Sequence, residues 1–183
     1  MSWMTIEGEE LVRLKRRINE TTGWKTNCLT AGRARVSFYA NGNLLYLKGE
    51  SGTACAVEGG DGTLFPLDGS SAQIYEGNEA AGLRLDINNV IDYAIFFCGF
   101  LRAADGDAFR FVVERGDWGL DTGLIPSDLT PRAASAVDGS GSFEITGYVA
   151  HCKELFRALF RVERDGVMMM LDDEPLGQIV GLQ

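Results

Sequence analysis

The chain has 183 residues, of which 45% are hydrophobic, and 26 acidic against 17 basic side chains give it a net charge of −9. That length and apolar content suffice for one hydrophobic core, so we predict a single domain over residues 1–183. The negative charge disfavours a nucleic-acid partner, because binding to phosphates depends on cationic side chains.

The sequence also lacks the signals of export and of membrane insertion. The N-terminus has no charged segment followed by an apolar one, as a signal peptide would have. The most apolar run, residues 90–101, contains Asp92 and falls short of the about 20 residues that a membrane helix needs. We therefore expect a cytoplasmic protein that does not bind membranes.

Residues 5–22 predict an N-terminal amphipathic helix. Leu11, Leu14 and Ile18 recur at the spacing of one helical face. Gly23 can end the helix in the left-handed conformation.

After this helix the apolar residues alternate, which indicates strands. Asn41-Gly42 is typical of a two-residue type I′ turn, since both central residues need a positive φ, and it predicts a hairpin of residues 35–40 and 43–48. The expected cross-strand pairs are Val36 with Leu47 and Phe38 with Leu45. Further antiparallel strands are predicted at residues 54–58, 63–67, 72–76 and 82–87.

Residues 89–103, NVIDYAIFFCGFLRA, form the most apolar segment and predict a helix that other elements cover. A buried strand is the alternative, because the segment is rich in aromatic and β-branched residues. Asn88 is the expected N-cap. A narrow stripe of Asn89, Asp92 and Gly99 interrupts the apolar surface, and Gly99 indicates a close approach of neighbouring backbone, since glycine costs about 1 kcal/mol in a helix.

The C-terminal half predicts mainly strands, at residues 109–114, 143–152, 155–164 and 167–172. Between the first two lies a long segment, residues 115–142, with a short helix expected at 131–137 because proline suits the first helical position. Such a segment is typical of a lid, a binding loop or an interface, or it wraps the sheet. Asp165-Gly166 predicts a second two-residue hairpin. Its pairing places on one face Phe156, Ala158, Phe160, Val162, Met169 and Leu171, and on the other Arg157 opposite Glu174.

Together these elements predict an α+β fold: a curved, mostly antiparallel sheet with an N-terminal amphipathic helix and a central buried helix packed on one face. The four cysteines, at 28, 55, 98 and 152, lie far apart without a CxxC pair, so we expect reduced thiols and no metal site. The glycine-rich turns lack the spacing of a phosphate-binding loop, and we predict no cofactor.

The only histidine, His151, precedes Cys152. Neighbours on a strand point to opposite faces, so His151 is not expected to act as a base for Cys152. The acidic run Asp172-Asp173-Glu174 alternates in the same way and forms no single cluster unaided. We therefore predict no catalytic residue and favour a protein that is not an enzyme.

The leading hypothesis is an intracellular binding or interaction protein, whose partner is another protein or a second copy of the chain in a homodimer. It would use exposed sheet edges and the long segment. The alternative is a small-molecule-binding protein or enzyme, with an apolar pocket between the sheet and the central helix that residues 115–142 cover. The candidate ligand-binding residues of that pocket are Asp92, Phe96, Phe97, Phe100, Trp118, Tyr148 and His151.

Overall fold

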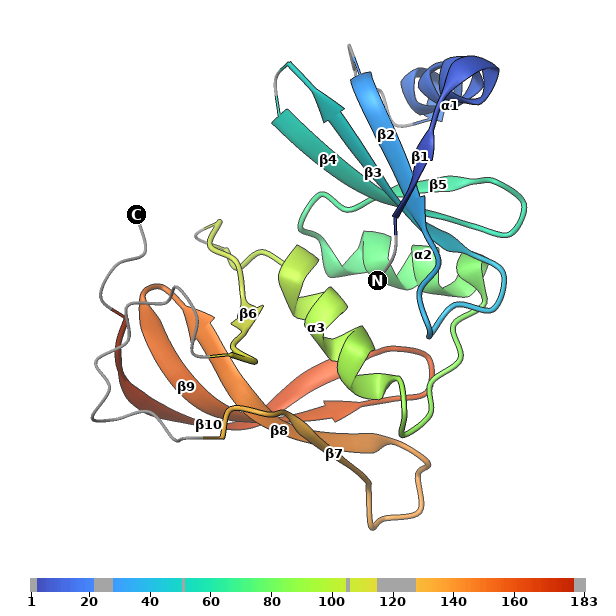
Figure 1. Ribbon diagram of the computed structural model, residues 1–183. Helices are drawn as coiled ribbons and strands as arrows, with labels where there is room; N and C mark the ends of the chain where they lie inside the picture. Colours follow the sequence, from blue (N-terminus) through green and yellow to red (C-terminus); the bar gives the residue numbers. More distant parts are fainter. Residues whose placement is uncertain (1–2, 22–27, 51, 105, 115–127, 180–183) are drawn as a thin grey trace. The chain divides into compact units, whose positions relative to one another are not determined.

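The computed structural model describes residues 3–21, 28–50, 52–104, 106–114 and 128–179 (Figure 1). The predicted α+β class with antiparallel sheets is confirmed. The described strands divide between two sheets of five strands, where the sequence pattern predicts one. The chain separates into two compact units, residues 1–84 and 85–183. The single-domain organisation stays a prediction.

Unit 1 contains a sheet whose five strands lie side by side in the order of the chain. They are β1 (Trp3–Ile6), β2 (Cys28–Ala34), β3 (Asn43–Gly49), β4 (Gly52–Glu58) and β5 (Leu64–Pro66). The predicted N-terminal helix is confirmed as α1 (Gly8–Thr21), while β1 has no counterpart among the predicted elements. Strands β3, β4 and β5 match their predicted segments closely.

The apolar stripe of α1 builds the core of this sheet. Leu14 and Ile18 are buried, at 3% and 0% exposure, and Leu11 packs against them. They meet one side of the sheet through Ile6, Ala31, Leu45, Leu47 and Leu64. The helix forms at this position because its apolar spacing matches the surface it covers.

The hairpin predicted at Asn41-Gly42 is wrong. Strand β2 ends at Ala34, which pairs with Leu44, so residues 35–42 form a connection between β2 and β3. Neither Asn41 nor Gly42 has a positive φ. Gly42 is needed for a different reason, because a Cβ there would lie 2.2 Å from the Cβ of Ala81.

The strands predicted at 72–76 and 82–87 are also wrong. The first segment lies in helix α2 (Ser71–Ala81), and the second contains only an isolated bridge between Leu83 and Tyr39. Ser70 caps the helix by accepting a hydrogen bond from the Ala72 amide at 3.2 Å, and Gly82 ends it at φ 68°. These are the cap residues that a helix prefers. Residues 35–42 dock on α2 through a bond from the Tyr39 hydroxyl to Asn78 Oδ1 at 2.8 Å.

Unit 2 contains the second sheet, in the order β10-β9-β8-β6, with β7 also paired to β8. Its strands are β6 (Arg110–Phe111), β7 (Arg132–Ser135), β8 (Phe143–His151), β9 (Glu154–Val162) and β10 (Met168–Gln178). The helix predicted at 131–137 is wrong, since β7 occupies that segment. The first part of the predicted long loop, residues 115–127, lies outside the described residues.

The predicted central helix is confirmed as α3 (Val90–Phe100), which lies over one face of this sheet (Figure 1). The N-cap is Asn89, not Asn88, and its Oδ1 accepts from the Asp86 amide at 2.9 Å. Asp92 and Gly99 are exposed, whereas Asn89 is buried. No neighbouring atom lies within 4 Å of a Cβ placed at Gly99, so the predicted close approach is wrong.

Tyr93 connects α3 to the turn between β9 and β10. Its side chain is fully buried, and its hydroxyl donates a 2.7 Å hydrogen bond to the carbonyl of Gly166. The turn contains three residues, 164–166, with Gly166 at φ 90°. The two-residue turn predicted at Asp165-Gly166 is therefore wrong.

Replacing Tyr93 by phenylalanine should lower the free energy of unfolding by about 1–2 kcal/mol, because the Gly166 carbonyl stays buried without its donor. Urea denaturation followed by circular dichroism measures this change. Tyr148→Phe is the matched control, since the hydroxyl of Tyr148 has no hydrogen-bond partner among the described residues. Equal losses in the two variants would contradict the assigned role of the Tyr93 hydroxyl.

Candidate functional site

The two faces of the second sheet have different neighbours. Residues Ile145, Val149 and Phe160 are buried on the face that α3 covers. Because side chains alternate along a strand, Thr146 and Arg157 lie on the opposite face, which we name the outer face. At one end of the outer face a separate apolar cluster forms from Val112, Leu129, Ala150, Leu155 and Ile179.

A cavity of about 200 Å³ opens on the outer face. It is lined by residues of β8, β9 and β10: Thr146, Arg157, Ala158, Leu159, Asp172 and Glu174. A β-bulge at Leu171 sets the positions of the acids, because it places Asp172 opposite Leu159 and Glu174 opposite Arg157. The predicted facing of Arg157 and Glu174 is thus confirmed.

The three-residue turn at 164–166 also changes which residues share a face, because it shifts the pairing of β10 before the bulge by one residue. Met170, not Met169, pairs with Phe160, and Ala158 pairs with Asp173. The prediction that Met169 and Leu171 lie on the same face as Phe160 is therefore wrong. Two acids of the run, Asp172 and Glu174, lie on one side of β10 and flank the cavity together.

The charged groups of the cavity are available to a ligand. Within the part of the chain that the structure describes, Arg157, Asp172 and Glu174 have no hydrogen bond or ion pair. Arg161, two residues after Leu159 on the same strand, differs in this respect. Its guanidinium contacts Asp138 at 3.0 Å and Glu144 at 3.2 Å.

The edge of the sheet beside the cavity carries an exposed apolar run. Strand β10 pairs only with β9 among the described strands. Met169, Met170 and Leu171 are 45%, 49% and 47% exposed, and the acidic run follows at once. Three large apolar side chains in succession at a sheet edge form a surface to which another chain can add a strand.

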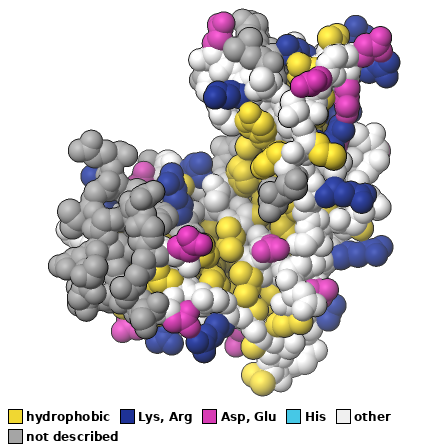
Figure 2. Space-filling view, viewed as in Figure 1, with side chains coloured by type: hydrophobic (Ala, Val, Ile, Leu, Met, Phe, Trp, Pro, Cys, Tyr) yellow, Lys and Arg dark blue, Asp and Glu magenta, His cyan; other side chains and the backbone are white. Residues whose placement is uncertain are grey.

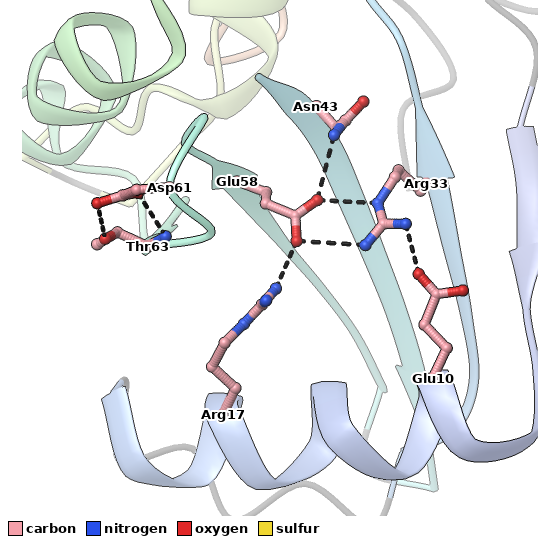
Figure 3. A network of polar contacts seen from close by, with 7 residues as sticks. All are labelled: Glu10, Arg17, Arg33, Asn43, Glu58, Asp61 and Thr63. Carbon is pink, nitrogen blue, oxygen red and sulfur yellow. Dashed lines mark hydrogen bonds and ion pairs between the residues drawn. The ribbon is translucent and has the colours of Figure 1, made fainter. Parts of the chain in front are cut away.

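A dense cluster of charges lies in unit 1, around Glu58 (Figure 3). Glu58 is 5% exposed and accepts hydrogen bonds from Arg17, from Arg33 at 2.8 and 3.2 Å, and from Asn43 at 3.2 Å. Burial alone would raise the pKa of Glu58, but the two guanidinium groups bring that pKa below its ordinary value. Since both carboxylate oxygens are engaged, the cluster fixes α1 to the sheet and is not a ligand site.

Further ion pairs shape the surface of α1. Arg13 pairs with Glu9 at 3.1 Å, and Arg33 of β2 reaches Glu10. In the space-filling view acidic and basic side chains are interspersed over this helix (Figure 2). Helix α1 therefore presents mixed charge and not a continuous basic surface.

The turn between β8 and β9 brings His151 and Cys152 together. Cys152 and Lys153 have φ of 49° and 64°, and this turn places the Cys152 Sγ 3.1 Å from the His151 Nε2. The prediction that the two side chains diverge is wrong, because β8 ends at His151 and alternation no longer applies. Left-handed conformations cost about 1–3 kcal/mol for residues other than glycine and gather at functional sites.

The residues of the predicted pocket divide into several groups. Phe96 and Phe97 are buried on α3, each with its ring 6.1 Å from that of Tyr93, and Phe100 lies 5.2 Å from Phe96. Asp92 is exposed on the same helix.

Tyr148 and His151 make contacts with other described residues. Tyr148 lies on the outer face, where it packs on the cluster of Ala150 and Leu155. His151 stacks on Phe109, with ring centres 4.2 Å apart. Trp118 lies outside the described residues. The structure thus joins three phenylalanines of the set and separates Tyr148 from them.

Neither a metal-binding cluster nor a helix long and apolar enough to cross a membrane occurs in the described part of the chain. No protein-family model matches the sequence, and no curated protein or solved structure matches it.

Proposed function

We propose that this chain is a binding protein that receives an extended, positively charged segment of a partner protein along strand β10. The observation that carries the proposal is the combination, on one edge strand, of an exposed apolar run and carboxylates beside a cavity. Extended segments bind sheet edges through main-chain hydrogen bonds, while pockets for alternate side chains supply specificity.

The apolar run supplies the first part of the contact. Residues 168–170 pair in regular register with β9, so their backbone is already extended and ready for another strand. Covering Met169, Met170 and Leu171 removes apolar surface from water, which favours association. The bulge at Leu171 ends this regular stretch of pairing. Beyond it, the partner must be held by side-chain contacts and not by strand pairing.

The cavity supplies the second part of the contact with the partner. At about 200 Å³ it is smaller than the about 300 Å³ at which sites for whole ligands begin, so it suits one side chain. Asp172 faces Leu159, which allows a lysine or arginine to lay its aliphatic stem on Leu159 and its charge against the carboxylate. Glu174 strengthens the negative field, although Arg157 opposite partly offsets it.

A second copy of the chain fits this edge less well. Antiparallel pairing of two β10 strands about their middle would bring the acidic runs of both copies face to face. Like charges directly opposite each other destabilise a strand pair. The charge therefore favours a basic partner over self-association.

A synthetic peptide tests the proposal with the intact chain. The probe is a capped, fluorescent peptide that alternates valine and lysine, and its binding is followed by anisotropy. Neutralising the acidic run with Asp172→Asn, Asp173→Asn and Glu174→Gln should weaken binding about fivefold, because the two acids that flank the cavity each lose an exposed ion pair of about 0.5 kcal/mol. Raising the salt concentration should reduce the difference.

The control neutralises three exposed acids of unit 1 and changes the net charge equally: Glu20→Gln, Glu50→Gln and Glu79→Gln. It should bind the peptide as the original chain does. Equal weakening by both triple variants, or equal binding of a peptide with glutamate in place of lysine, would refute the proposal. If light scattering shows a dimer that Met170→Lys dissociates, a second copy is the occupant instead.

A further inference from the structure

The turn between β8 and β9 is closed by a strand pair and tied to the end of β10 by a hydrogen bond. His151 pairs with Glu154, so Cys152 and Lys153 form a two-residue loop in which both residues are left-handed. This is the backbone of a type I′ turn, which usually contains asparagine and glycine. The Ile179 amide donates a 2.6 Å hydrogen bond to the Lys153 carbonyl and fixes the turn to the end of β10.

The conformation brings an imidazole nitrogen to the thiol. The His151 Nε2 lies 3.1 Å from the Cys152 Sγ. The imidazole is stacked on Phe109 with an angle of 12° between the rings, so its nitrogen is held toward the sulfur. Cys152 itself is exposed, so a reagent can reach it from solvent.

The thiols of Cys55 and Cys98 are more buried than that of Cys152. Burial raises the pKa of the Cys98 thiol to about 12 and raises that of Cys55 as well. A thiol reacts as its thiolate, so these two positions are unreactive near neutral pH. A metal site does not explain the pair, because in the described part of the chain no third His, Cys, Asp or Glu completes one.

We infer that Cys152 is a nucleophilic thiol that exchanges with small-molecule disulfides, and that His151 is its base. The imidazole takes the proton from Sγ, and the thiolate attacks one sulfur of the disulfide. A bond forms between the two sulfurs as the disulfide bond breaks. The departing thiolate takes the proton from the imidazolium and leaves as a thiol, so Cys152 is oxidised to a mixed disulfide and the reagent is reduced.

The charges around the pair are mixed. Lys153 and Glu154 flank Cys152 on the turn, Arg110 lies on the neighbouring β6, and β10 contributes the neutral Gln178 opposite Glu154. These groups are unchanged in a variant that alters only His151. A difference in rate between that variant and the original chain therefore reports the imidazole.

The test uses the full chain, glutathione disulfide as the reagent, and mass spectrometry with peptide mapping. At pH 7 we expect one glutathionyl group at Cys152, added before any at Cys55 or Cys98, and none at position 152 in Cys152→Ser. His151→Phe keeps a ring on Phe109 but removes the base, and should slow the reaction about tenfold, because an ordinary thiol is only a few per cent ionised at pH 7.

The pH dependence of the exchange rate distinguishes a role of His151 as a base from a purely structural role. At about pH 9.5, above the ordinary thiol pKa of about 8.5, the original chain and His151→Phe should react at similar rates. Circular dichroism verifies the fold, and His151→Gln replaces the phenylalanine variant if that one does not fold. Equal rates at pH 7, a tenfold difference that persists at pH 9.5, or first modification at Cys55 or Cys98 would overturn the inference.

Discussion

Replacement of Glu58 by glutamine should lower the free energy of unfolding of unit 1 by about 3 kcal/mol. The carboxylate is 5% exposed and compensates the guanidinium groups of Arg17 and Arg33. Removing one partner of a buried ion pair costs about 3–5 kcal/mol, because the other charge stays without compensation. Both arginines are partly exposed, which places the loss at the lower end of that range.

Urea denaturation followed by circular dichroism measures the loss, with Glu79→Gln as the control. Glu79 is an exposed acid of the same unit, so its neutralisation should change stability by less than about 0.5 kcal/mol. A loss for Glu58→Gln no larger than the control would show that the cluster does not stabilise the unit.

The pH dependence identifies the charge as the cause. The pKa of folded Glu58 lies below its ordinary value, so its stabilisation is complete above the unfolded-state pKa of about 4.3. It is lost as the pH falls through the lower pKa of the folded chain. The stability difference between the original chain and Glu58→Gln should therefore be constant near neutral pH and shrink below about pH 4.

Periodic patterns in the sequence predicted the elements whose faces differ in polarity. Leu11, Leu14 and Ile18 located α1, and the alternation of Phe143, Ile145 and Val149 located β8. The length of the apolar run around Phe96 favoured the helix α3, whereas its aromatic and β-branched residues left a buried strand as the alternative. In each case burial of the apolar residues decides the local structure, so the pattern is visible in the sequence.

The secondary-structure predictions that were wrong concern segments whose local structure is decided by a tertiary contact. Helix α2 has little apolar periodicity, and the signals that could have found it are its caps, Ser70 and Gly82. Pro131 predicted a helix, but the pairing of Arg132–Ser135 with β8 imposes a strand.

The outer-face cavity was predictable only in part. The facing of Arg157 and Glu174, and with it that of Leu159 and Asp172, follows from counting along a two-residue hairpin, because the bulge at Leu171 offsets the third residue of the turn. Neither the third turn residue nor the bulge leaves a signal in the sequence. The contact between His151 and Cys152 depends on a turn without glycine, for which the sequence offers no turn signal. Both candidate sites arise at irregularities of strands whose existence the sequence did predict.

Gly42 illustrates how one motif can serve two purposes. Asn-Gly usually marks a tight turn, but here the Asn41 amide donates to the Ala81 carbonyl at 3.1 Å, so the connection lies against the end of α2. A Cβ at position 42 would lie 2.2 Å from the Ala81 Cβ and 2.8 Å from the Glu58 carbonyl oxygen. The neighbouring atoms are backbone or the first side-chain atom, and they cannot rotate away.

Gly42→Ala should therefore destabilise unit 1 by about 3 kcal/mol, since forcing a methyl group into a filled interior shifts the backbone. The lower chain entropy of unfolded alanine offsets only about 0.4–1 kcal/mol of this. Gly99→Ala is the control with the opposite sign: the position is exposed on α3 with no neighbour within 4 Å, so alanine should stabilise by about 1 kcal/mol. Adding Ala81→Gly to Gly42→Ala removes the nearest contact and should restore part of the loss in urea denaturation. If Gly42→Ala is as stable as the original chain, α2 does not pack against residues 35–42 as the structure shows.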